Sequence, residues 1–147
     1  MTEIPSIHDL IFSEDKEVIN IIFQFKGIIY GGYIRDIVSK WFNILPDNIP
    51  VDIDAVFWDD MEKPFIRRMK RLGYVLSNNN HGCFSLNKLG ARSIDFYSVK
   101  NYKDGSCLKP EIFPDFMVNT LMFDGKELQS WNSVVDEKSV SIVLNHI

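Results

Sequence analysis

The sequence predicts an α+β fold within a single domain spanning residues 1–147. Its length of 147 residues is enough for one domain with a hydrophobic core and short for two. Apolar residues recur at helical spacing in some stretches, whereas other short runs are rich in strand-forming residues. The expected helices cover 14–26, 34–41 and 64–72, and the main expected strands cover 28–30, 51–58 and 92–99.

The first predicted helix, residues 14–26, has one apolar stripe, formed by Val18, Ile21, Ile22 and Phe25. Ser13 is its expected N-cap and Gly27 its expected stop. A short buried strand then leads into Gly31-Gly32 and the second helix.

The glycine pair at this strand-to-helix junction predicts a site for an anion such as a triphosphate. Glycine lets the backbone approach a ligand closely, and the free N–H groups of a first helical turn favour negative charge. The alternative is that Gly31 and Gly32 only form a turn. Arg35, in the early turns of the helix, is either a phosphate ligand or the partner of a nearby carboxylate.

Asp52 and Asp54 lie two apart in the predicted strand 51–58 and therefore point to the same side. Val51, Ile53 and Ala55 are expected on the other side, in the core. Strands disfavour Asp, and two carboxylates on one face repel each other, so the pair indicates either a solvated sheet edge or a metal site. Mg2+ takes such oxygen ligands and shares them with substrate phosphates. The sequence therefore favours a metal-dependent nucleotide site.

Further along, residues 64–72 are expected as a helix with Pro64 in its first turn and Gly73 as its stop. Its basic residues form either a solvated face or a patch for an acceptor; they are Arg67, Arg68, Lys70 and Arg71. Strands are expected at 74–76 and 83–86 around a loop containing His81, which we interpret as a surface turn residue rather than a catalytic base.

Asp95 is a third carboxylate within a strand, 92–99, and shares one face with Ser93 and Tyr97. If this strand lies beside 51–58, Asp95 becomes a third metal ligand, and we expect Asp52, Asp54 and Asp95 to converge within a few ångströms. The later expectations are a loop at 101–110, a helix at 114–123, a hairpin at 122–129 around Asp124-Gly125, and a last strand or helix remnant at 139–145.

The net charge, the cysteines and the hydrophobic pattern argue against several classes of protein. A net charge of -4 argues against a free-standing nucleic-acid binder, although it leaves room for a small basic patch. Cys83 and Cys107 lack the spacing of a zinc site or a disulfide framework. With no signal-peptide pattern and no membrane-spanning run, the sequence is typical of a reduced, cytoplasmic protein.

Three segments resemble motifs in the head domain of tRNA CCA-adding enzymes and bacterial poly(A) polymerases, members of the polymerase-β-like nucleotidyltransferase superfamily. They are Gly31-Gly32-x-x-Arg35-Asp36, Asp52-x-Asp54, and Asp115-Phe116-Met117-Val118-Asn119-Thr120-Leu121, which is similar to Asp-Phe-Thr-Ile-Asn-Ala-Leu. Asp95 falls where the family places its third acidic strand residue. The resemblance covers roughly residues 27–125 and implies a small, mixed, strongly bent sheet backed by helices.

The resemblance also implies a two-metal phosphoryl transfer that uses Mg2+, with Mn2+ as an alternative. Asp52, Asp54 and Asp95 would be the catalytic and metal-binding residues. The nucleotide-binding residues would be Gly31, Gly32, Arg35 and Asn119, with an NTP as substrate.

Two departures from the family shape the expected function. Phe113 and Pro114 stand where the family has two arginines, and the chain stops where the family continues into helical domains that select the base and hold tRNA. We therefore expect a minimal nucleotidyltransferase rather than CCA addition. Its hydroxyl acceptor would be an RNA 3′ end, held through a partner or a basic patch, or a protein or small molecule. The alternatives are a non-catalytic nucleotide-binding or interaction module and a structural protein with a coincidental motif.

Overall fold

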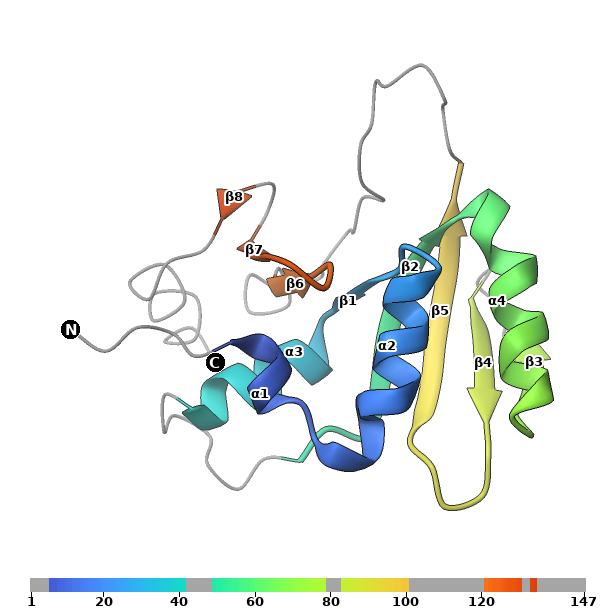
Figure 1. The fold of residues 1–147 in the computed structure, drawn as a ribbon, viewed down its shortest axis with the longest axis horizontal. Helices are drawn as coiled ribbons and strands as arrows, with labels where there is room; N and C mark the ends of the chain where they lie inside the picture. The colour runs from blue at the N-terminus through green and yellow to red at the C-terminus, as the bar shows by residue number, and fades with distance from the viewer. Residues whose placement is uncertain (1–5, 42–48, 79–82, 101–120, 131–132, 135–147) are drawn as a thin grey trace.

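The computed structural model describes residues 6–41, 49–78, 83–100, 121–130 and 133–134, and the fold is drawn in Figure 1. The helical elements are α1 (Ile7–Leu10), the 3-10 turn η1 (Ser13–Asp15), α2 (Lys16–Gln24), α3 (Gly32–Trp41) and α4 (Asp59–Arg71). The strands are β1 (Ile28–Tyr30), β2 (Asp52–Trp58), β3 (Val75–Asn78), β4 (Phe84–Asn87), β5 (Ser93–Val99), β6 (Leu121–Phe123), β7 (Leu128–Ser130) and β8 (Ser133–Val134). No helix in these ranges is long and apolar enough to cross a membrane.

All the described strands join one mixed sheet in the order β3-β4-β5-β2-β1-β6-β7-β8. Only the central pair, β2 and β5, is parallel among the pairings described, and the other neighbours are antiparallel. A parallel pair requires a crossover, which α4, β3 and β4 provide between the two strands. The predicted α+β class, with a mixed sheet backed by helices, is confirmed.

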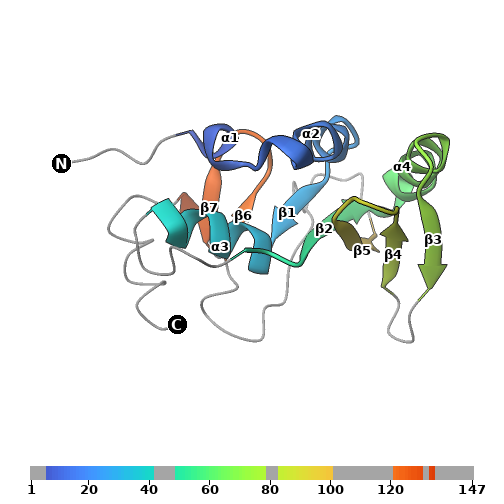
Figure 2. The ribbon, with the colours of Figure 1, turned by 90° about the horizontal axis from the view of Figure 1, so that it is seen from below.

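Helices α1, α2 and α4 lie along one face of the sheet, as Figure 2 shows. Alternate residues of β2 point into this helical layer, where Phe57 contacts Phe65 of α4 with ring centroids 4.3 Å apart. The other face of β2 carries Asp52, Asp54 and Val56, and Val56 belongs to a separate, smaller apolar cluster. The helices therefore cover the main core and leave the carboxylates on the opposite face.

The start of helix α2 differs from the prediction. Ser13 opens the 3-10 turn η1 instead of capping a long helix, and α2 begins at Lys16 without a side-chain cap. Asp15 holds the N-cap position, but its carboxylate is turned inward toward Tyr33 and Arg92. Short helix α1 precedes this region and was not predicted.

Gly27 follows α2 as predicted, but for a different reason. The helix ends at Gln24, and it is Lys26 that adopts the left-handed conformation, with φ of 60°. A Cβ on Gly27 would lie 2.6 Å from side-chain atoms of Ile22 and Phe57. Close packing between α2 and β2 therefore requires glycine here.

Helix α4 corrects the predicted position of Pro64. The helix starts at Asp59, so Pro64 lies inside it rather than in its first turn. Acidic residues in the first turn and basic residues in the last both complement the helix dipole.

Two further predictions need correction. Val51 is 86% exposed, because β2 begins at Asp52 and Val51 lies in the bend before it. Residues 121–123 form strand β6 rather than the end of a helix, because they pair with both β1 and β7. The predicted elements at 101–110, 114–120 and 139–145 fall outside the described residues.

The predicted hairpin around Asp124-Gly125 is confirmed. It joins β6 to β7, with Gly125 at a φ of 97°. The Asp124 carboxylate accepts hydrogen bonds from the backbone N–H groups of Lys126 and Glu127. Strands β3 and β4 lie within two residues of their predicted bounds.

A buried polar network joins η1, α3 and the residues that precede β2 and β5. The Asp15 carboxylate accepts hydrogen bonds from the Tyr33 hydroxyl at 2.8 Å and from Arg92 Nε at 3.0 Å. Arg92 Nη1 donates to the carbonyl of Pro50 at 2.6 Å. The network ties η1 to α3 and to the chain segments that enter β2 and β5.

We expect Asp15→Ala to lower the free energy of unfolding by about 3–5 kcal/mol, because it leaves the Arg92 guanidinium and the Tyr33 hydroxyl without their shared acceptor. Glu14→Ala is the matched control, since Glu14 meets Arg92 at 3.5 Å but its side chain is 63% exposed against 4% for Asp15. That change should cost at most about 1 kcal/mol. Urea titration followed by circular dichroism measures both, and equal losses would contradict the network's role.

Candidate active site

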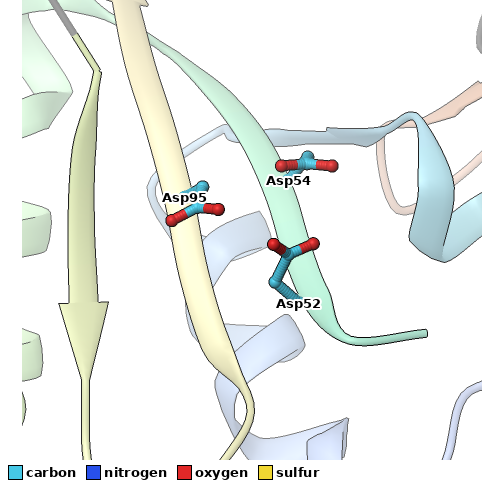
Figure 3. Close-up of side chains that lie close together, drawn as sticks. All are labelled: Asp52, Asp54 and Asp95. Carbon is cyan, nitrogen blue, oxygen red and sulfur yellow. The ribbon is translucent and has the colours of Figure 1, made fainter. Parts of the chain in front are cut away.

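Three carboxylates meet on the sheet face opposite α1, α2 and α4. Asp52 and Asp54 come from β2 and Asp95 from β5, and the parallel register places Asp54 directly beside Asp95. One carboxylate oxygen of each residue lies within 4.8 Å of those of the other two. Figure 3 shows the three side chains on neighbouring strands, gathered around one space. The expected convergence is therefore found.

The cluster is electrostatically unfavourable for a protein without a cation. Burial, followed by the charges of Asp52 and Asp95, raises the pKa of Asp54 to about 7. Burial and a hydrogen bond with Asp95 likewise raise the pKa of Asp52 to about 6. The Arg35 guanidinium acts in the opposite direction on the Asp54 pKa.

The glycine turn lies against this cluster. Gly31 adopts a φ of 71°, a conformation that residues with a Cβ rarely adopt, and α3 begins at the next residue. A Cβ on Gly31 would lie only 3.3 Å from Asp54 Oδ2. The first turn of α3 and the carboxylates are thus adjacent, as one ligand bearing both phosphate and metal would require.

Arg35 satisfies one of its two predicted roles directly. Its Nε donates to Asp36 Oδ1 at 2.9 Å, and the Asp36 side chain is buried. Its guanidinium also lies near the turn, since Arg35 Nη2 would be 3.4 Å from a Cβ on Gly32. Asp36 therefore holds Arg35 beside the glycine pair, and phosphate binding by Arg35 stays a prediction.

Some predicted residues cannot be placed at this site. Asn119, Phe113, Pro114 and His81 lie outside the described residues. The exposed basic residues of α4 are on a helix whose Phe65 and Met69 pack against the helix-covered face of the sheet. They are therefore separated from the carboxylates by the sheet itself.

The structure also adds residues that the sequence did not single out. Tyr30 pairs with Asp54 across β1 and β2, and its ring meets that of Tyr97 edge to face at 6.0 Å. Burial raises the pKa of both hydroxyls, so they are neutral at physiological pH. On β4, Ser85 donates a hydrogen bond to Asp95. Strand alternation already placed Tyr97 on the same face as Asp95, but Tyr30 and Ser85 required knowledge of which strands pair.

The donor set fits a hard divalent cation. All three side chains offer carboxylate oxygens, which are the ligands that Mg2+ and Mn2+ prefer. A bound cation would also offset the repulsion that raises the pKa values of Asp52 and Asp54. The residues that could hold it are Asp52, Asp54 and Asp95.

No protein-family model and no curated protein matches the sequence at a significant level. The fold, in contrast, matches solved CCA-adding enzymes. An apo form aligns with a TM-score of 0.60 and 16% identity, over 96% of this chain and 34% of that one. A complex with ATP aligns with a TM-score of 0.59 and 19% identity, over 99% of this chain and 36% of that one. A complex with CTP aligns with a TM-score of 0.55 and 17% identity, over 99% of this chain and 35% of that one. The chain thus shares its fold with CCA-adding nucleotidyltransferases and spans about a third of their length.

The raised pKa values predict how pH affects stability. Because the folded-state pKa of Asp54 lies above its usual value of 3.8, the folded protein binds a proton that the unfolded chain releases. The stability contributed by this proton is lost as the pH rises from about 4 to about 7. In EDTA, we expect Asp54→Asn to melt at a higher temperature than the wild type at pH 8, with the difference shrinking toward pH 5.

Differential scanning fluorimetry across this pH range provides the measurement. Asp9→Asn is the matched control, because it makes the same change on the exposed surface of α1 and should follow the wild-type profile. If Asp54→Asn and the wild type lose stability in parallel, the carboxylates do not repel one another as described.

Proposed function

We propose that this chain acts as a minimal, single-domain nucleotidyltransferase, transferring an NMP from an NTP to a hydroxyl acceptor. The observation that carries the proposal is the contact between two features: three converging carboxylates and a glycine turn whose Gly31 lies against Asp54. The shared fold with CCA-adding enzymes supports the same class of chemistry.

Each residue has a defined task in this proposal. Asp52, Asp54 and Asp95 would hold Mg2+, or Mn2+ in its place. The chemistry supplied by the bound metal is neutralisation of charge on the transferring phosphoryl group and activation of the attacking hydroxyl. The first turn of α3, at Gly31 and Gly32, would receive the phosphates of the NTP.

Two further residues would complete nucleotide binding. Arg35, held by Asp36, would add a positive charge next to the phosphates. Asn119 would sit near the nucleotide, in line with the family motif it resembles. The rings of Tyr30 and Tyr97 pack together on the same face of the sheet as the carboxylates.

The acceptor is less defined than the nucleotide. The neighbouring structures include complexes with ATP and with CTP, which supports an NTP as substrate here. An RNA 3′ end is one acceptor, reached through a partner protein or the basic patch of α4, and proteins and small molecules are the others. That patch lies across the sheet from the carboxylates, so it could hold only a distant part of the acceptor.

The second candidate function is a nucleotide-binding module without turnover. The observation in its favour is Phe113-Pro114, which stands where the resembling family has two arginines. Transferases of this kind depend on positive charge around the phosphoryl group, and loss of one such group commonly slows catalysis by about 100-fold or more. The basic residues of α4 cannot directly replace those arginines from the opposite face.

We therefore expect slow turnover of labelled NTPs with Mg2+, tested against RNA, protein and small-molecule acceptors in parallel. Asp54→Asn should abolish transfer while keeping the fold, because it removes a metal ligand without changing side-chain size. Asp9→Asn should transfer at the wild-type rate. Wild-type turnover by Asp54→Asn would show that the chemistry lies elsewhere, whereas binding of Mg-NTP without any transfer would favour the module.

A further inference from the structure

The carboxylate of Asp95 is held from outside the cluster by a serine on the neighbouring strand. Ser85 of β4 lies directly opposite Asp95 in the antiparallel pair of β4 and β5. Its Oγ donates to Asp95 Oδ1 at 2.5 Å, the length of a hydrogen bond from a hydroxyl to an ionised carboxylate. Such bonds are roughly twice as strong as those between neutral groups.

This bond fixes the direction of the remaining oxygen. In Figure 3, one oxygen of Asp95 points toward β4 and the other toward Asp52 and Asp54. With Oδ1 engaged by Ser85, the carboxylate plane is set and the second oxygen faces the cluster.

The alternative is that Ser85 only fastens β4 to β5, but other contacts already do this. Backbone pairing runs from Phe84 opposite Phe96 to Leu86 opposite Ile94, and the two phenylalanine rings stack with centroids 5.6 Å apart. A second cross-strand bond of the same kind, from Ser93 Oγ to Asn87 Oδ1, measures 2.6 Å. The Ser85 bond is distinguished by its acceptor, a member of the carboxylate cluster.

We propose that Ser85 is a positioning residue that holds Asp95 in the orientation needed to bind a divalent cation together with Asp52 and Asp54. The inference rests on the proposed function, since it assumes that the three carboxylates bind a metal. Groups that hydrogen-bond to metal ligands orient them, and removing such groups typically lowers metal affinity by about 10–100-fold.

The experiment measures Mn2+ binding to the full chain, from the loss of the free-ion signal in electron paramagnetic resonance. Ser85→Ala should bind Mn2+ about 10-fold or more weakly than the wild type. Ser77→Ala is the matched control, because it removes a cross-strand serine bond between β3 and β4, from Ser77 Oγ to the carbonyl of Ser85, and should leave affinity unchanged. Asp95→Asn should bind more weakly still, since it removes a ligand.

A second pair of variants separates the hydroxyl from side-chain shape. Ser85→Thr keeps the donor and should retain near wild-type affinity, whereas Ser85→Val, whose side chain is isosteric with threonine but has no hydroxyl, should behave like Ser85→Ala. Both are β-branched residues suited to a strand, so this pair remains informative if the alanine variant unfolds. Melting temperatures recorded in EDTA identify any unfolded variant.

The outcomes distinguish the two levels of the proposal. Failure of the wild type to bind Mn2+, or equal binding by Asp95→Asn, overturns the proposed metal site itself. If the wild type binds and Asp95→Asn does not, equal affinity in Ser85→Val and Ser85→Thr overturns the role of Ser85. Equal weakening by Ser85→Ala and Ser77→Ala would also overturn it and assign both serines to strand attachment.

Discussion

The parallel pairing of β2 with β5 is the contact on which the site depends. It places Asp54 beside Asp95 on one face of the sheet, and a shift of one residue would turn Asp95 toward the opposite face. Arg92 precedes β5 and donates to the carbonyl of Pro50, two residues before β2. The same guanidinium binds Asp15, which also accepts from Tyr33 at the start of α3. One buried network therefore connects the starts of both acidic strands with the helix that follows the glycine turn.

The residues that form the candidate site lower the stability of the folded protein around them. The pKa values of Asp52 and Asp54 are raised because the two carboxylates are partly desolvated and lie close to other carboxylates. Gly31 is held in a left-handed conformation at the same point, where a side chain would press against Asp54. Shifted pKa values and unusual backbone conformations are common at ligand-binding sites. Here a cation would neutralise the carboxylates, and a phosphate group would occupy the glycine turn. The main core, in contrast, lies under the helices on the other face and carries none of this cost.

The sequence could predict what short-range patterns encode. Alternation within 51–58 and 92–99 placed the three aspartates on strand faces, and Asp124-Gly125 marked the hairpin. It could not reveal contacts between distant segments, such as Arg92 with Asp15, which are 77 residues apart, or Ser85 with Asp95. Pro64 did not mark the start of α4, because the helix begins at Asp59 with an acidic first turn and continues through the proline. Leu121–Phe123 became a strand because two neighbouring strands were available to pair with it.

We propose that the cluster of Asp52, Asp54 and Asp95 and the glycine turn form one site for a metal-bound nucleotide. The decisive measurement is a crystal structure of the protein with Mn2+ and a non-hydrolysable NTP analogue, with the metal located by its anomalous scattering. We expect an anomalous peak within coordination distance of the three carboxylates, with the triphosphate against the first turn of α3. An anomalous peak elsewhere, or a triphosphate bound away from Gly31 and Gly32, would contradict it.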